Sequence, residues 1–144
     1  MPPPAVSNHP VDVGQRSETA ILAALEARGY LVWLPWGVNH RFDMIVEAGD
    51  RLLRIQCKTG RLRNGAVHFR AQSVRCNTKQ ILTRNYVGEV DYFAVYCPDT
   101  GGVYIVPCDE TTRSEVTLRL HPAANQQKKG IRWAADYALD RFAP

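Results

Sequence analysis

The chain has 144 residues, about the length of one compact domain, and 45% of them are hydrophobic and 22% charged. Eighteen lysines and arginines outnumber fourteen aspartates and glutamates, which gives a formal net charge of +4. This composition is typical of a globular protein and excludes a disordered chain, a collagen-like fibre and a coiled coil, and no apolar run approaches the roughly 18 residues that cross a bilayer.

The chain begins with a proline-rich segment, and we expect residues 1–13 to form a flexible arm ahead of a single domain over residues 14–144. The arm lacks the charged and apolar regions of a signal peptide, so the protein is expected to stay in the cytoplasm, away from membranes. Residues 14–28 predict a helix, because apolar side chains repeat at helical spacing from Ile21 to Leu25 and Gly29 follows as a stop signal.

Short β-type runs follow the predicted helix. We expect a tight turn at Gly49 and Asp50 between two of the strands, and strands over residues 30–35, 40–48, 51–59 and 66–70. The polar and basic residues 72–88 predict only a loop or a short helix.

The second half of the chain predicts a further hairpin over residues 91–97 and 103–107, a strand over 116–120, and an amphipathic helix over 131–142. The predicted fold class is therefore α/β, with a mixed β-sheet flanked by helices.

Cysteines and histidines are spread along the chain. None of the four cysteines forms a CxxC pair, and a cytosolic chain with this spacing is expected to keep them as buried or partly buried thiols. A zinc site would have to be assembled from distant residues, so we expect neither zinc nor disulfides.

The basic residues are unevenly distributed. From Arg51 to Gly88 there is no carboxylate, yet half of the eighteen lysines and arginines fall there. Such a stretch is either a solvated basic face or a groove that neutralises nucleic-acid phosphates and gains affinity by releasing counterions. The residues that we expect to line such a groove are Arg61, Arg63, Arg70, Arg75, Lys79 and Arg84.

The tight turn predicts the register of one hairpin. If Gly49 and Asp50 close a two-residue turn, Asp43 lies opposite Gln56. Side chains alternate along a strand, so Lys58 lies on the same face as Gln56. The three polar groups therefore converge on one face. The opposite face collects an apolar set suited to a core: Phe42, Met44, Val46, Leu53, Ile55 and Cys57.

A second carboxylate, Glu18, shares the apolar stripe of the predicted first helix with Ile21 and Leu25. A carboxylate on a core-facing stripe is costly unless it is paired or binds a metal. The alternative is that Glu18 lies near the helix start and only stabilises the helix dipole.

Each polar residue of the hairpin also has a purely structural interpretation. Asp43 could form a salt bridge with Arg41 or Arg54. Gln56 could make a cross-strand hydrogen bond, and Lys58 could be a solvated strand end. Their convergence on one face beside a basic stretch favours a functional site.

The run RFDMIVEAGDRLLRIQCKTGR resembles the PD-(D/E)XK nuclease superfamily, with Asp43 as the motif's aspartate and Gln56-Cys57-Lys58 in the place of (D/E)XK. Glu18 resembles the glutamate that the superfamily often contributes from its first helix. The glutamine variant, together with the segments YVGEVDYFAVY and VYIVP, is most similar to the small homing-type endonucleases associated with group I introns. The resemblance covers nearly the whole chain from Gly14 onward.

Two positions depart from the family pattern. Phe42 replaces the motif's proline, which affects only the local backbone. Gln56 replaces an acid; its amide oxygen can still bind a hard cation, though more weakly than a carboxylate. Asp43 and Glu18 are then the main anionic ligands.

The resemblance implies a restriction-endonuclease-like fold and a Mg²⁺-dependent endonuclease that hydrolyses phosphodiester bonds in double-stranded DNA, with Mn²⁺ as a substitute. It implies that Glu18, Asp43, Gln56 and the backbone carbonyl of Cys57 hold the ion. Lys58 would orient the nucleophilic water and stabilise developing negative charge. The implied catalytic residues are Glu18, Asp43, Gln56 and Lys58.

Three alternatives remain at this point: a nuclease-like fold kept only for DNA binding, a structure-selective junction resolvase, and an adaptor domain that binds no nucleic acid. We also expect a homo-oligomer, a dimer or a tetramer, because one small domain has one active site and cutting both strands takes two.

Overall fold

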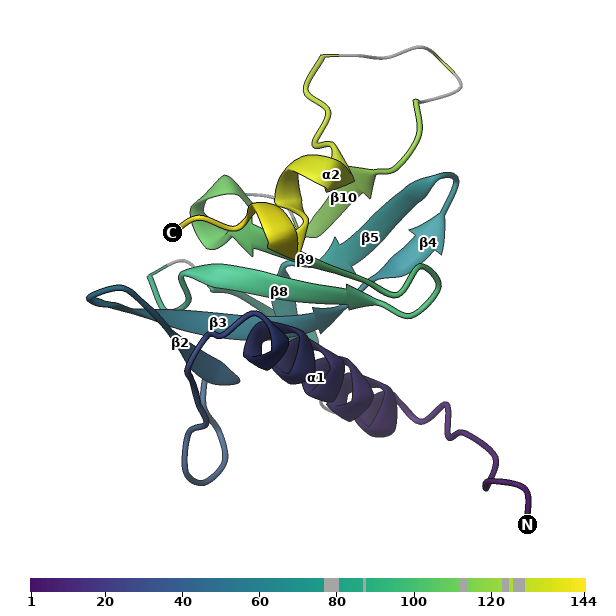
Figure 1. The fold of residues 1–144 in the computed structure, drawn as a ribbon. Coiled ribbons are helices and arrows are strands. Elements are labelled where there is room, and N and C mark those ends of the chain that lie inside the picture. The colour runs from purple at the N-terminus through teal and green to yellow at the C-terminus, as the bar shows by residue number, and fades with distance from the viewer. Residues whose placement is uncertain (77–80, 87, 112–113, 123–124, 126–128) are drawn as a thin grey trace.

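The computed structural model describes residues 1–76, 81–86, 88–111, 114–122, 125 and 129–144. A five-stranded sheet lies at its centre, in the order β1-β2-β3-β8-β9, with β3 and β8 parallel and the other neighbours antiparallel (Figure 1). The bounds of these strands are Val32–Trp33 for β1, Met44–Ala48 for β2, Arg51–Thr59 for β3, Tyr92–Cys97 for β8 and Gly102–Pro107 for β9.

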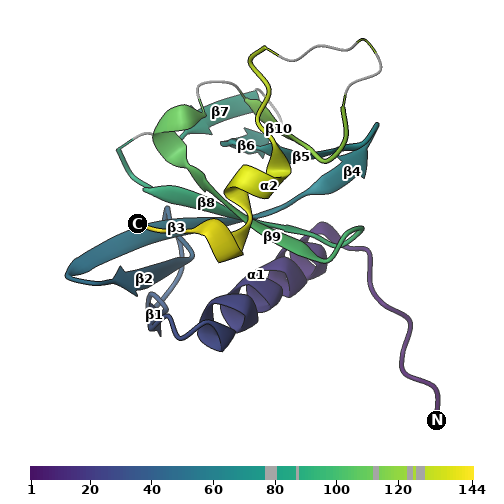
Figure 2. The same cartoon turned by 45° about the horizontal axis from the view of Figure 1, so that its top comes forward.

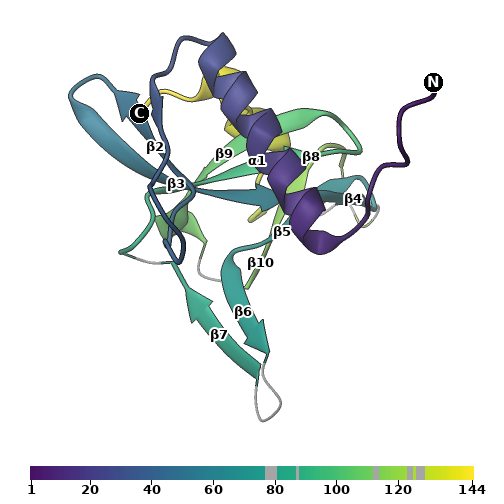
Figure 3. The same cartoon turned by 90° about the horizontal axis from the view of Figure 1, so that it is seen from below.

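Helix α1 (Pro10–Ala27) covers one face of this sheet (Figure 3). Its Ile21 and Leu25 are buried in a hydrophobic cluster with strand residues that include Met44, Val46, Leu53, Ile55, Ala94 and Ile105. The helix begins earlier than predicted, inside the expected arm, because Pro10 suits a first helical position and the His9 side chain accepts a hydrogen bond from the Val11 N–H. The division into an arm over 1–13 and a domain over 14–144 stays a prediction.

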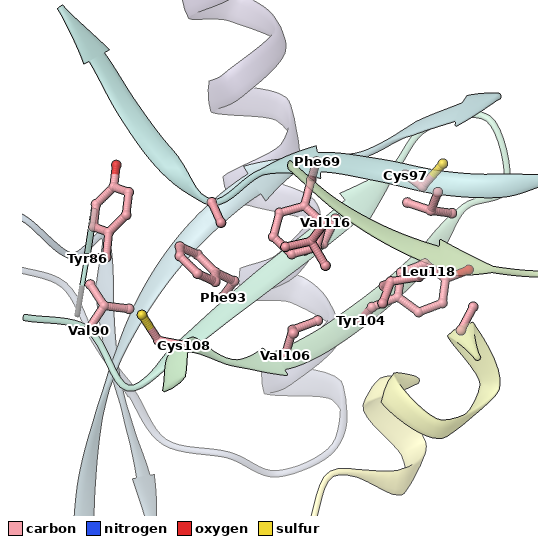
Figure 4. Packing of buried hydrophobic residues seen from close by; sticks show 14 residues of the cluster. Phe69, Tyr86, Val90, Phe93, Cys97, Tyr104, Val106, Cys108, Val116 and Leu118 are labelled. Carbon is pink, nitrogen blue, oxygen red and sulfur yellow. The ribbon is translucent and has the colours of Figure 1, made fainter. Parts of the chain in front are cut away.

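The opposite face packs against a second sheet of three strands, in the order β10-β5-β4, and against α2 (Ala134–Tyr137) (Figure 2). These strands span Arg61–Arg63 for β4, Ala66–Arg70 for β5 and Glu115–Arg119 for β10. Phe93 lies at the centre of this second cluster (Figure 4), with its ring centroid 5.7 Å from that of Phe69 and 5.5 Å from that of Tyr86. The central sheet therefore has one hydrophobic core on each face.

The predicted loop or short helix over residues 72–88 is wrong for 72–76 and 81–85, while residues 77–80 and 87 lie outside the described residues. Strands β6 (Gln72–Cys76) and β7 (Ile81–Asn85) form an antiparallel pair that projects from the rest of the fold (Figure 3). The segment contains Val74, Ile81 and Thr83, whose β-branched side chains favour extended backbone. Together with β4 and β5, this hairpin belongs to the crossover between the parallel strands β3 and β8.

The predicted C-terminal helix over 131–142 is also wrong in extent. Only α2 is helical, followed by the short 3₁₀ turn η2 (Leu139–Arg141); a similar turn, η1, spans Cys108–Glu110. Trp133 and Ala138 adopt extended backbone, and they form isolated bridges with Arg119 and Tyr104. These two residues pair with β10 and β9, and this pairing interrupts the helix that the apolar spacing predicts.

The remaining elements are close to prediction. The strands expected over 51–59, 66–70, 91–97, 103–107 and 116–120 are confirmed to within a residue, whereas those over 30–35 and 40–48 are shorter. Strand β4 was not predicted, although Asn64 and Gly65 form a hairpin turn with φ values of 52° and 72°. Cys57, Cys97 and Cys108 are free thiols, as expected. Across the described residues, no helix is both long and apolar enough to cross a membrane.

Gly60 allows β3 to pass from the central sheet into β4. A Cβ at this position would lie 2.6 Å from Val67 Cγ1 and 3.0 Å from Val95 Cγ1. We expect Gly60→Ala to lower the free energy of unfolding by about 1–3 kcal/mol through overpacking, as measured by urea denaturation. The matched control is Gly14→Ala in α1, where a Cβ meets nothing within 4 Å and alanine favours the helix. Equal stability of Gly60→Ala and the parent would contradict this close packing.

Candidate active site

The β2–β3 hairpin has the predicted register. Ala48 pairs with Arg51 and Met44 with Ile55 across a turn in which Gly49 takes a φ of 64°. Four residues of the predicted apolar set, Met44, Val46, Leu53 and Ile55, are buried beneath α1, and Cys57 packs against them. Phe42 differs: it packs against the cluster on the other face. Residue 42 precedes β2, so the alternation of the strand does not extend to it.

Asp43 is held at the entrance to β2 by the backbone of β3. Its N–H donates to the Ile55 carbonyl at 2.8 Å, and its Oδ2 accepts from the Cys57 N–H at 2.8 Å. The two arginines considered as salt-bridge partners pair with other carboxylates, Arg41 with Glu89 and Arg54 with Asp91. The observed partners of Asp43 thus favour a functional over a salt-bridge role.

Glu18 and Asp43 line one pocket of about 400 Å³, with the loop over residues 34–40 forming much of its wall. Burial raises the pKa of both carboxyl groups, and the charge of Asp43 raises the pKa of Glu18 further. The Cys57 N–H and Lys58 act in the opposite direction on the pKa of Asp43. A partly buried carboxyl group whose pKa is raised by a second carboxylate beside it is an arrangement that a bound cation would relieve.

Lys58 is packed against aromatic rings and is not the solvated strand end considered above. Its Nζ donates to the Tyr86 hydroxyl at 3.3 Å and lies 4.6 Å from the Tyr86 ring centroid and 5.9 Å from that of Phe93. Burial lowers the pKa of Lys58 to about 8; Asp43 opposes this shift, while Arg41 and Arg70 add to it. The ammonium is therefore fixed in position and weakly solvated.

Tyr86 is the site residue that sequence reasoning missed. It is 5% exposed, and Arg41 Cζ lies 4.1 Å from its ring centroid. No motif marks Tyr86, because it contacts Lys58 only through the fold. An aromatic residue among polar ones was the one available signal.

Gln56 and Cys57 complete the motif on β3. Gln56 is half-buried and stands level with Phe93 of β8 in the parallel register. The pKa of the Cys57 thiol is well above its usual value, because of burial first and then the charges of Asp43 and Glu18. The thiol therefore stays protonated, and the contact of Cys57 with Asp43 is made by the backbone.

The predicted DNA-binding residues are dispersed. Arg70 is exposed at the end of β5, and its charge reaches Lys58. Arg61 lines a different pocket, of about 850 Å³, and Arg63 pairs with Glu115 at 3.1 Å. The structure does not test the other three predicted DNA-binding residues. Lys79 lies outside the described residues, and for Arg75 and Arg84 only the position in β6 and β7 is described.

The donor set that the motif implies suits a hard cation, and of this set Glu18 and Asp43 line the pocket. Two carboxylates, a carboxamide and a backbone carbonyl are all oxygen donors, which Mg²⁺ prefers. Within the described parts of the chain, three His, Cys, Asp or Glu side chains nowhere gather into a metal site. Gln56 and the Cys57 carbonyl would therefore have to supplement Asp43 and Glu18.

Comparison with known proteins agrees with this arrangement. Residues 8–140 match the PD-(D/E)XK endonuclease family. The chain belongs to this family. Membership identifies it as a DNA endonuclease, and PD-(D/E)XK nucleases generally use divalent metal ions.

The fold is also similar to that of a solved structure. The bacterial homing endonuclease I-Ssp6803I matches with a TM-score of 0.74 and 20% sequence identity, over 91% of this chain and 89% of that chain. The search of curated proteins gives no significant match. The predicted restriction-endonuclease-like fold is confirmed.

Proposed function

We propose that this PD-(D/E)XK protein is a Mg²⁺-dependent endonuclease that hydrolyses phosphodiester bonds in double-stranded DNA. Its proposed catalytic residues are Glu18, Asp43, Gln56 and Lys58. The observation that carries the proposal is one pocket with two carboxylates, Glu18 and Asp43, beside a half-buried lysine, Lys58, whose charge interacts with Asp43. This combination provides metal ligands and a fixed cation for a phosphate.

Each residue has a separate task in the proposed mechanism. Asp43, Glu18, the Gln56 side chain and the Cys57 carbonyl would hold the ion, which supplies a more acidic water and charge neutralisation when bound. Lys58 donates a hydrogen bond to the phosphate and stabilises the negative charge that develops in the transition state. The Tyr86 hydroxyl holds the Lys58 ammonium in place, so this stabilisation needs little reorganisation.

The experiment that tests the proposal is cleavage of supercoiled plasmid in Mg²⁺, in Mn²⁺ and in EDTA. Nicking or linearisation is expected with either metal and none with EDTA. Cleavage in EDTA would overturn the metal requirement. DNA binding without cleavage in any metal would favour the alternative of a fold kept only for binding.

We also propose a homing role, a dimeric or tetrameric assembly, and a cytoplasmic location. The homing role is supported by the likeness to I-Ssp6803I and by the glutamine at position 56. Faster cleavage of a four-way junction than of linear duplex would instead identify a junction resolvase. Sedimentation of the protein on a linear duplex measures the number of subunits.

The carboxamide of Gln56 gives a direct test of the metal site. Gln56→Glu is expected to tighten Mn²⁺ binding on the order of tenfold, because a carboxylate replaces a neutral oxygen, and titration calorimetry measures the change. Gln15→Glu is the matched control, since it adds the same charge on α1 and lines the other pocket. An unchanged Mn²⁺ titration for Gln56→Glu would mean that residue 56 is not a ligand.

A further inference from the structure

The loop between β1 and β2 presents an apolar tip to solvent. Leu34 is 60% exposed, Trp36 97% and Val38 82%. These side chains alternate along the loop, which projects from the sheet edge near α1 (Figure 1). Exposed apolar groups gathered in one place are typical of a contact surface.

Internal contacts give this loop a defined shape. His40 Nε2 donates to the Trp36 carbonyl at 2.5 Å, which closes the loop across four residues. Gly37 and Asn39 take left-handed φ values of 87° and 67°. Asparagine and glycine tolerate this conformation at the lowest cost. Trp36 is therefore held at the tip of a structured turn.

The same loop forms a wall of the candidate active site. Six of its residues line the pocket that contains Glu18 and Asp43: Leu34, Pro35, Gly37, Val38, Asn39 and His40. Residues 34–42 include no carboxylate, so the loop does not repel phosphates. Trp36 does not line the pocket itself, so its indole is placed to meet a nucleotide next to the one whose phosphate enters the pocket.

We propose that Trp36, flanked by Leu34 and Val38, contacts the bases next to the scissile phosphate in double-stranded DNA and inserts at a base step. This inference rests on the proposed function of the pocket. Apolar side chains used as wedges partly unstack a base step, and the exposed base faces then stack on aromatic rings. An apolar indole ring gains little binding energy from contact with a charged phosphate, so its proposed partner in DNA is a base.

A second copy of the chain is the competing occupant of this tip. Stable protein interfaces involve about 20–30 residues on each side. Even with Leu31 and Trp33, which are 52% and 55% exposed just before the loop, the exposed large apolar side chains from residue 31 to 38 are five. This number suits a base step better than a dimer interface.

The first test measures affinity for a random-sequence duplex in EDTA by fluorescence anisotropy. We expect Trp36→Ala to weaken binding by about 5- to 150-fold, the equivalent of about 1–3 kcal/mol for a stacked base. The salt dependence should be unchanged, because no phosphate contact is lost. Trp36→Phe should recover most of the affinity. Trp33→Phe, on β1 with its indole bonded to Glu47, is the matched control and should bind like the parent.

The second test locates the indole directly. The chain has three tryptophans, so a Trp33→Phe, Trp133→Phe variant reports on Trp36 alone. Duplex DNA should protect its fluorescence from acrylamide quenching. Protection that appears with rising protein concentration and no DNA would show that a second copy covers the tip and would overturn the proposal.

The results of these tests distinguish a failure of the proposal for Trp36 from a failure of the proposed endonuclease function. If the parent cuts plasmid in Mg²⁺ and Trp36→Ala binds duplex as tightly as the parent does, only the proposed role of Trp36 is overturned. A parent that neither binds duplex nor cuts plasmid overturns both.

Discussion

Lys58→Ala is expected to cut plasmid DNA about 100-fold or more slowly than the parent in Mg²⁺, as for removal of a preorganised group that stabilises transition-state charge. The ammonium is held by the Tyr86 hydroxyl and lies over the Tyr86 ring, so it is positioned before the substrate binds. Single-turnover cleavage rates measure the loss. DNA affinity should fall only slightly, because one cation is removed.

Tyr86→Phe is the informative companion to this variant. It keeps the ring against which Lys58 packs and removes only the hydroxyl that accepts the hydrogen bond. The cleavage rate should therefore fall less than in Lys58→Ala, with duplex affinity unchanged. Circular dichroism checks that both variants fold. A purified Lys58→Ala protein that cuts at the parental rate would remove Lys58 from the mechanism.

Asp43→Asn is expected to abolish cleavage and, in EDTA, to raise the melting temperature above that of the parent. Burial raises the pKa of Asp43, so its charge destabilises the folded state at neutral pH, where the carboxyl is ionised in both states. Asparagine has no charge, and its side-chain oxygen can still accept the hydrogen bond from the Cys57 N–H. Duplex binding without metal should be at least as tight, because repulsion from phosphate is relieved.

The difference in melting temperature between the parent and Asp43→Asn should depend on pH, because it arises from the charge of Asp43. As the pH falls through the raised pKa of Asp43, the parent carboxyl takes up a proton and the difference in melting temperature should disappear. At neutral pH, where the carboxyl is ionised, Mg²⁺ should stabilise the parent more than Asp43→Asn, because a ligand that binds the folded state stabilises it. Asp50→Asn, an exposed change in the turn of the same hairpin, is the control. Equal melting temperatures at neutral pH would contradict the burial penalty on Asp43.

The β2–β3 hairpin could be predicted from the sequence because local rules determine it. A two-residue turn at Gly49 and Asp50 sets the register, and alternation then places Met44 and Ile55 in the core. The face of Phe42 could not be predicted by the same rule, because this residue lies before the strand.

The rest of the site depends on contacts between segments far apart in the sequence. Tyr86 reaches Lys58 from 28 residues further along the chain, across a hairpin that was not predicted. Arg61 and Arg63 follow β3 directly, yet Arg61 lines another pocket and Arg63 is paired with Glu115. Neither lines the pocket of Asp43, because the chain leaves the central sheet at Gly60.

Cys57 stands in the middle of the nuclease motif, yet its thiol takes no part in the contact with Asp43. Only its backbone N–H faces that carboxylate, while the side chain packs against the core beneath α1. A partly buried thiol whose pKa is raised reacts slowly with oxidants and alkylating agents, since the thiolate is the reactive form. Oxidants and thiol-directed inhibitors should therefore have little effect at Cys57, although this cysteine lies between two of the proposed catalytic residues.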